Sequence, residues 1–252
     1  MPYVNYKTTV LEVKSIYKNK LVKNDFVNQV IYNENVLLLS SSDSRLEKLI
    51  YLIGNLELNS DKDYFTALAT SIIGQQLSSK AATTIRKRVS LLCNGVITPE
   101  SIISIPYDDL RAAGLSKAKT EYIKDLAEKV YTKKIDFNEI CLKEDNEIIS
   151  SLTEVKGIGK WTAEMFLIFA LNRVNVMSYA DAGLQRAARW LYNSPEIPKY
   201  NYLQKVESSW EPFKSIASLY LWESIDRGYV DSGNSLDELF LKKIQTKEPP
   251  IN

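Results

Sequence analysis

Two glycines one residue apart, Gly157 and Gly159, constrain the fold of this chain more than any other feature. The apolar residues Leu152 and Val155 precede them at helical spacing, and Ile158 between them would plug a turn. Glycine allows backbone angles and close approaches that a side chain would block. The pattern therefore predicts a tight turn between two helices.

The second helix of this pair would begin directly after Gly159. Backbone N–H groups in the first turn of a helix have no partner within it and attract an anion, and Lys160 adds a positive charge beside them. A phosphate contact is one interpretation. A bare Gly-x-Gly is more often an ordinary corner between helices, but the whole string from Leu152 to Ala163 is far more specific.

Asp181 follows Trp161 by twenty residues and stands directly before a stretch of helical spacing that begins at Ala182. Its simplest role is to cap that helix, which contributes ~1 kcal/mol. The N-terminus of a helix also favours an ionised carboxylate, because its amide donors and dipole stabilise negative charge. Asp181 is therefore a candidate catalytic group, and the two roles are compatible.

Charge is nearly balanced over the 252 residues, with 32 basic and 31 acidic side chains, so no global attraction draws the chain to nucleic acid. One stretch differs: residues 64–99 contain no Asp or Glu and carry Lys80, Arg86, Lys87 and Arg88. Such a stretch fits phosphate contacts. A solvated helix face is the alternative interpretation.

Histidine is absent, and Cys93 and Cys141 are the only cysteines. Zinc sites of the common Cys/His spacings and four-cysteine iron–sulfur clusters are thereby excluded. Acid–base chemistry would fall to carboxylates, lysine or tyrosine. No apolar run approaches the ~20 residues of a membrane span, and no export signal is evident at the N-terminus. We expect an intracellular protein without a membrane segment.

Helical spacing dominates the chain after residue 43. The sequence Ser44 to Glu47 has the form of a capping box, which predicts a helix start there and an end near Gly54. Further helices are expected at 65–73, 81–89, 99–110, 117–132, 148–155, 161–171, 184–192, 212–224 and 235–244. Residues 8–13 and 36–39 favour β structure instead.

These patterns predict a mainly α protein, a two-lobed helical bundle with a helix-hairpin-helix motif. We divide the chain into an N-terminal appendage with some β structure at 1–42, a helical domain at 43–245 and a polar tail at 246–252.

Four motifs, in this order and spacing, resemble the helix-hairpin-helix DNA glycosylases, and the 3-methyladenine DNA glycosylase II (alkylbase) branch is the most similar. The resemblance covers about residues 43–230. The motifs are Ser71-Ile72-Ile73-Gly74-Gln75-Gln76-Leu77-Ser78, Ala113-Gly114-Leu115-Ser116 with Lys119, Val155 to Ala163, and Asp181 with Gly183-Leu184-Gln185-Arg186-Ala187.

By position, the resemblance makes Asp181 the catalytic aspartate and puts Trp161 where bifunctional relatives hold a catalytic lysine. Without an amine there, no Schiff base and no strand cleavage are expected. Lys160 is a poor substitute, since one helical position turns a side chain by ~100°. The resemblance implies a monofunctional hydrolase that requires no cofactor.

The resemblance also implies the surroundings of Asp181. The base pocket would contain Trp161, Trp222, Met165 and Tyr220, with Met165 standing where some relatives have a tyrosine. DNA contacts would come from Gly157, Gly159, Lys160, Thr162, Gln76, Leu77, Ser78 and Lys80. The backbone carbonyls of Thr153, Val155 and Ile158 would hold a sodium or potassium ion. On residue type alone, Trp161, Trp222 and Tyr220 are equally explained as core aromatics, and Gln76 as a helix-end residue.

The implied function is removal of alkylated purines from double-stranded DNA in base excision repair, with action as a monomer as the default. Aromatic faces suit a flipped, cationic base. Two alternatives remain at this point. One is a helix-hairpin-helix module that binds DNA without catalysis, and the other is a glycosylase for oxidised or deaminated bases.

Overall fold

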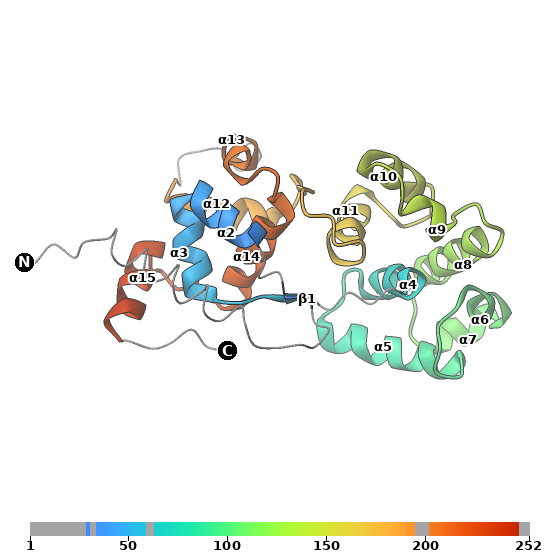
Figure 1. The fold of residues 1–252 in the computed structure, drawn as a ribbon. Coiled ribbons are helices and arrows are strands. Elements are labelled where there is room, and N and C mark those ends of the chain that lie inside the picture. The colour runs from blue at the N-terminus through green and yellow to red at the C-terminus, as the bar shows by residue number, and fades with distance from the viewer. Residues whose placement is uncertain (1–28, 31–33, 59–62, 195–201, 247–252) are drawn as a thin grey trace, which may run out of the picture.

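The computed structural model describes residues 29–30, 34–58, 63–194 and 202–246, which are almost entirely helical (Figure 1). Within these ranges the only strands are β1 (Gln29–Val30) and β2 (Glu57–Leu58), which pair antiparallel. Most of the predicted appendage and residues 247–252 of the predicted tail lie outside the described residues. No described helix has the length and apolar character to cross a membrane.

The first lobe is built from consecutive helices, on the right in Figure 1, around one hydrophobic core that includes Ile72, Leu126 and Leu167. Its helices are α4 (Tyr64–Gly74), α5 (Ser79–Leu92), α6 (Pro99–Ser104), α7 (Tyr107–Ala112), α8 (Lys117–Tyr131), α9 (Phe137–Ile140), α10 (Asp145–Thr153) and α11 (Lys160–Phe169).

The second lobe combines segments from both ends of the described chain around a core that includes Leu46, Leu184 and Trp210. Its elements are α2 (Glu34–Ser42), α3 (Ser44–Ile53), α12 (Ala182–Tyr192), α13 (Tyr202–Val206), the 3-10 helix η1 (Glu207–Trp210), α14 (Lys214–Asp226) and α15 (Leu236–Gln245). Leu56 and Trp222 pack against both cores. The predicted two-lobed helical bundle is confirmed.

Residues 36–39 are helical, so the β structure expected there is wrong. They belong to α2, where Val36 and Leu39 lie one turn apart and are buried against the second core. Residues three positions apart lie on the same face of a helix, which here is buried. Tertiary packing therefore overrides the weak β preference of these residue types.

The helix expected at 99–110 is two helices. Ile105 is extended because the residue before a proline disfavours helical angles, and Pro106 then stands at the N-cap of α7. The capping box at Ser44 is also wrong, since the cap of α3 is the preceding residue, Asp43.

Asp43 is a buried carboxylate, 8% exposed, that ties three parts of the second lobe together. Its Oδ1 accepts hydrogen bonds from the backbone N–H groups of Arg45 and Leu46, at 2.9 and 3.1 Å. Its Oδ2 accepts from Tyr192, whose pKa is raised by burial and by this carboxylate, so the hydroxyl keeps its proton. Oδ2 also accepts from the Ser209 hydroxyl and the Trp210 indole N–H.

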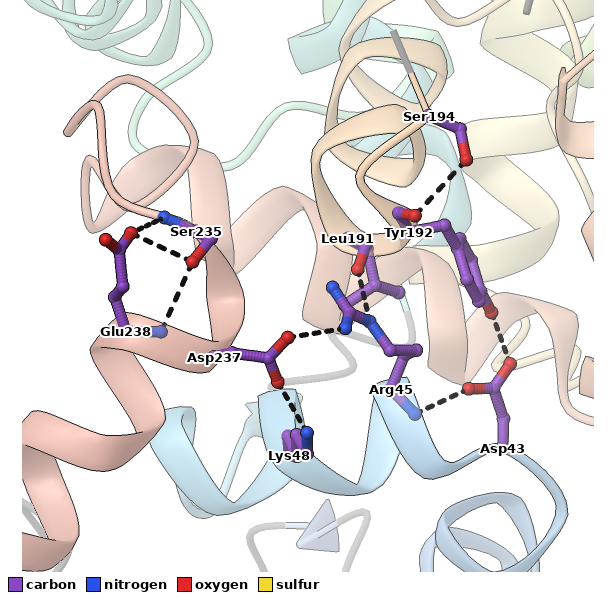
Figure 2. A network of polar contacts seen from close by, with 9 residues as sticks. All are labelled: Asp43, Arg45, Lys48, Leu191, Tyr192, Ser194, Ser235, Asp237 and Glu238. Carbon is purple, nitrogen blue, oxygen red and sulfur yellow. Dashed lines mark hydrogen bonds and ion pairs between the residues drawn. The ribbon is translucent and has the colours of Figure 1, made fainter.

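Figure 2 shows how this network continues to the C-terminal helix. Arg45 donates to the Leu191 carbonyl at the end of α12 and to Asp237 on α15, which also pairs with Lys48. The hydrogen bond from Lys48 is the largest effect on the pKa of Asp237 and lowers it. Arg45 lowers this pKa further, and burial, which alone would raise it, does not outweigh the two cations. Ion pairs therefore connect α3 and α15, which come from opposite ends of the described chain.

Replacing Asp43 tests this network. Asp43→Ala removes a helix cap and leaves the half-buried Tyr192 hydroxyl without its acceptor, so we expect a loss of about 3 kcal/mol in the free energy of unfolding. Asp63→Ala is the control, because the Asp63 carboxylate caps α4 at an exposed position. That variant should lose ~1 kcal/mol. Urea unfolding measures both, and equal losses would contradict a role beyond capping.

Candidate active site

The predicted glycine turn is confirmed: α10 ends at Thr153, α11 begins at Lys160, and residues 154–159 form the hairpin between them. Gly157 has φ +80°, which side chains rarely adopt. A Cβ at this position would also lie 2.0 Å from the Tyr122 ring. Glycine is therefore required at 157 by both backbone angle and space.

The N-terminus of α11 is open. Its N-cap is Gly159, and among the described residues no side chain caps its first turn. The N–H groups of that turn are therefore available to an anion from outside. Lys160 is 72% exposed beside them. Thr162 is different, because its side chain is buried and only its backbone N–H belongs to this surface.

Asp181 lies between two tryptophans from the two lobes. The indole N–H of Trp161, on α11, donates to Asp181 Oδ2 at 2.8 Å. The indole N–H of Trp222, on α14, donates to Oδ1 at 3.4 Å. Oδ1 also accepts from the Leu184 backbone N–H at 2.8 Å, so the predicted N-cap role is confirmed. Among the described residues no Lys or Arg forms an ion pair with this carboxylate, and its negative charge is not neutralised.

The segment that leads to Asp181 is anchored to α11 by a second carboxylate. Glu164 is buried, and its Oε2 accepts from the Ser178 hydroxyl at 2.6 Å. The Ser178 carbonyl in turn accepts from the Asp181 backbone N–H at 3.2 Å. Lys160 Nζ lies 3.8 Å from Glu164 Oε1. Both Trp161 and the backbone before Asp181 are thus held by the same helix.

An open hollow of about 370 Å³ adjoins Trp222. Its lining residues are Leu56, Phe169, Leu219, Trp222, Glu223, Ile225 and Asp226. The rings of Phe169 and Trp222 are 5.6 Å apart and tilted by 31°. Trp222 therefore belongs to the hollow and contacts Asp181 as well, which brings an aromatic cavity next to the carboxylate.

Phe169 was not among the predicted pocket residues, although a signal existed. Trp161, Met165 and Phe169 follow one another at intervals of four, which places them on one face of α11. Met165 is half-buried on this face and packs against the first core.

The placement of Tyr220 in the base pocket is wrong. Its side chain is 0% exposed, and its hydroxyl donates to the Gly54 carbonyl at 3.2 Å inside the second core. Tyr220 and Trp222 are two positions apart, about 200° around a helix, so they face opposite sides of α14. Of the two, only Trp222 reaches the hollow.

The turn between α4 and α5, residues Gln75 to Leu77, is the second surface that the sequence predicted to contact DNA. Gln76 is exposed and has φ +56°, and Leu77 is 39% exposed although it is apolar. Ser78 caps α5 by accepting from Ala81 N–H at 3.3 Å, which explains its residue type without DNA. Lys80 is exposed at the start of α5, and Arg86, Lys87 and Arg88 are exposed further along it.

This turn contacts the hairpin directly. Gln75 Nε2 donates to the Gly157 carbonyl at 2.8 Å. The turn at 75–77, the hairpin, Trp161 and Asp181 therefore form one connected surface: Trp161 follows the hairpin in sequence and donates to Asp181. The hairpin can thus bind a phosphate, while the negatively charged carboxylate of Asp181 lies close to it on the same surface.

The family to which this chain belongs follows from its similarity to known proteins. Residues 69–212 match the family model described as HhH-GPD superfamily base excision DNA repair protein. The chain belongs to this superfamily. The match begins before the turn at 75–77 and includes the hairpin and Asp181, so every part of the connected surface lies within it.

Similar proteins share most of their length with this chain. DNA-3-methyladenine glycosylase 1 of Schizosaccharomyces pombe is 36% identical over 192 residues, which are 74% of this chain and 84% of that protein. The crystal structure of a DNA-3-methyladenine glycosidase from Bacillus halodurans has a TM-score of 0.75 at 39% identity and covers 83% of this chain and 96% of its own. A Schizosaccharomyces pombe 3-methyladenine DNA glycosylase in complex with abasic DNA has a TM-score of 0.70 at 34% identity, covering 77% and 97%.

The two hairpin glycines predict different outcomes for the same substitution. Gly157→Ala places a methyl group against Tyr122 at a left-handed backbone angle, so we expect a loss of about 2 kcal/mol or more in the free energy of unfolding and weaker DNA binding. Gly159 has φ −90°, and a Cβ there meets no atom within 4 Å. Because Gly159 is the N-cap of α11, where alanine is less favourable than glycine, Gly159→Ala should lower the free energy of unfolding by no more than ~1 kcal/mol.

Urea unfolding and fluorescence anisotropy with a labelled duplex measure these two quantities. A loss of DNA binding in Gly159→Ala at unchanged stability would mean that a methyl group obstructs the approach of the phosphate. Full stability of Gly157→Ala would contradict the tight packing of Tyr122 on this turn.

Proposed function

We infer that this chain is a monofunctional DNA glycosylase, which hydrolyses the N-glycosidic bond of alkylated purines of the 3-methyladenine type in double-stranded DNA during base excision repair. The observation that carries this conclusion is the Asp181 carboxylate, held between two indole N–H groups beside an aromatic hollow. The similar proteins are named as glycosylases or glycosidases of 3-methyladenine, and the structure of one of them is a complex with abasic DNA.

The carboxylate supplies what bond cleavage needs. When the bond between the sugar C1′ and the base nitrogen breaks, the electron pair leaves with the base and positive charge develops on the sugar. An anionic group beside the sugar stabilises that charge. Asp181 is suited to this role because its charge is not cancelled by a cation among the described residues, and its two oxygens are fixed by donors on three helices.

Water then completes the reaction. A water molecule adds to C1′ and loses a proton, for which Asp181 is the nearby acceptor. The departing alkylated purine was cationic, and the electron pair that it receives neutralises it, so no protein acid has to protonate it. This agrees with a chain that contains no histidine.

The hollow suits a cationic base. Phe169 and Trp222 present aromatic surface, which attracts a positive charge through the ring quadrupole. Glu223 and Asp226 add carboxylates to its lining, although Arg227 pairs with Glu223 at 2.6 Å. We propose that the extruded base enters here, with Gln76 and Leu77 filling the space that it leaves in the duplex.

The residues argue against a lyase step. Trp161 has no amine to form a Schiff base. Lys160, the nearest lysine in sequence, extends to Glu164 and lies 3.8 Å from that carboxylate rather than at Asp181. The reaction therefore ends with the released base and an abasic site.

We further propose that the hairpin carbonyls of Thr153, Val155 and Ile158 hold a sodium or potassium ion when DNA is bound. Oxygen ligands suit such hard cations. The Val155 carbonyl accepts from Ile158 N–H at 3.1 Å, and a carbonyl has a second lone pair for a cation. The ion would strengthen the grip on a phosphate and takes no part in bond cleavage.

Asp181→Asn tests the central assignment. The amide caps a helix as well as the acid does, so the free energy of unfolding should change by less than ~1 kcal/mol and DNA binding should persist. The negative charge is lost, and we expect single-turnover release of 3-methyladenine and 7-methylguanine from methylated duplex DNA to fall by about 100-fold or more. Asp63→Asn, at another helix cap, is the control and should keep full activity.

Two results would contradict the inference. Undiminished base release by Asp181→Asn would remove the catalytic role from this carboxylate. Wild-type protein that binds methylated duplex DNA but releases no base would favour a module that binds without catalysis.

Trp161→Phe tests the hydrogen bond to Asp181 separately from the aromatic surface. The variant keeps a ring at position 161 but loses the N–H that donates to Oδ2. With one carboxylate oxygen released from its donor, we expect a roughly tenfold slower single-turnover rate and little change in DNA affinity. Trp161→Lys would in addition show whether an amine here leads to a covalent intermediate, trapped with borohydride.

A further inference from the structure

Helix α8 contacts both turns that face the DNA in the proposed function. Lys119 Nζ donates to the Ile73 carbonyl at 2.9 Å and to the Gln75 carbonyl, where α4 ends and the turn at 75–77 begins. On the same helix, Asp125 Oδ2 accepts from the Lys156 backbone N–H of the hairpin at 2.9 Å. The Tyr122 ring, between them in sequence, packs against Gly157.

These contacts form a closed circuit. Lys119 holds one turn, Tyr122 and Asp125 hold the hairpin, and the Gln75 side chain joins the two turns through the Gly157 carbonyl at 2.8 Å. Residues 119, 122 and 125 are three apart, so they follow one another along one side of α8. The helix therefore sets the distance between the turn and the hairpin.

The charges in this circuit are partly buried and fully engaged. Burial lowers the pKa of Lys119, and its ammonium is compensated by carbonyls at the C-terminal end of α4, where the helix dipole favours a cation. Burial alone would raise the pKa of Asp125, but hydrogen bonds from Lys129 and from Lys156 N–H lower it. Both groups are thus held in place by several hydrogen bonds, unlike mobile surface charges.

We propose that Lys119 and Gln75 are positioning residues, which hold the turn at 75–77 against the hairpin so that Gln76 and Leu77 enter the duplex at the place that the phosphate contact sets. The proposal rests on the proposed function. Lys119 would touch no DNA and would act through the backbone of Ile73 and Gln75. Extruding a base costs a few kcal/mol, and a displacement of ~1 Å in such a device costs about 100-fold in rate.

The chain offers a matched control on the same helix. Lys124 also lies on α8, its pKa is also lowered by burial, and its Nζ donates to the carbonyls of Ile102, Ile103 and Ile105 at the end of α6. Lys124 therefore donates to carbonyls at the end of a helix as Lys119 does, but its helix is α6, which is not part of the turn at 75–77 or of the hairpin. Lys119→Met and Lys124→Met remove the same cation from equivalent surroundings.

The experiment compares two duplexes with a single 7-methylguanine, one opposite cytosine and one opposite an abasic-site analogue. A paired lesion has to be extruded and its gap filled, whereas the lesion without a partner needs less help. For Lys119→Met we expect the single-turnover rate on the paired lesion to fall about tenfold or more, and by less than about threefold on the unpaired lesion. Lys124→Met should leave the ratio of the two rates unchanged, even if both variants lower the Tm.

Gln75→Met provides a second variant that keeps all charges and should shift the ratio in the same direction. The proposal would be overturned by an equal loss on both duplexes in Lys119→Met and Gln75→Met. It would also be overturned if Lys124→Met shifted the ratio of the two rates as much as Lys119→Met does. Binding gives a readout independent of chemistry, namely the preference for a duplex with an abasic-site analogue over an intact duplex. Wild-type protein that shows this preference but releases no base would contradict the proposed function only, while loss of the preference in Lys119→Met would still support the positioning role.

Discussion

The hydrogen bonds of Asp181 are the constraint on which the rest of this structure depends. The carboxylate is anchored by its own helix, by Trp161 from the first lobe and by Trp222 from the second. Each lobe has its own core, so nothing within one lobe alone could place both indoles. The relative position of the lobes is in turn fixed by side chains such as Leu56 that pack against both cores. The geometry at the carboxylate is therefore a property of the whole helical bundle.

A tryptophan at position 161 fits this constraint better than a lysine would. An ammonium beside Asp181 would neutralise the negative charge that the proposed role of this carboxylate requires. An indole N–H fixes the same oxygen by a neutral donor, and the ring offers aromatic surface, 47% exposed, at the edge of the site. The nearby cation, Lys160, is drawn to Glu164 instead. Among the described residues the Asp181 carboxylate thus has no cation as a partner, and in the proposed function the backbone N–H groups of the hairpin and the exposed Lys160 would bind the DNA.

Sequence reasoning succeeded where a local rule decides the outcome, and failed where packing decides it. Gly157 needs its residue type for a left-handed angle and Asp181 stands at a helix start, so both could be recognised without coordinates. Tyr220 could not be separated from Trp222, because polar and apolar residues are spread around α14 without a distinct apolar face, and its sequence does not say which face meets the hollow. The cap of α3 was missed by one position, since Asp43 and Ser44 are both good caps and the buried partners of Asp43 decide between them. Helical spacing could have placed Phe169 on the same face as Trp161. Its contact with Trp222 could not be foreseen, because Trp222 lies on a segment distant in sequence.

The contacts of α8 show that packing also decides the role of a residue within a sequence motif. The segment around Lys119 contributed to the family resemblance, yet nothing in its sequence indicates that the lysine reaches back to the end of α4. The last carbonyls of a helix have no partners within the helix. In the proposed function the turn at 75–77 inserts exposed residues into the duplex, so these residues cannot be buried in a core. An ammonium on a neighbouring helix satisfies those carbonyls and leaves Gln76 and Leu77 free at the surface. Residues that never touch DNA would then be as tightly constrained as those that do, because the two turns are useful only at a fixed separation.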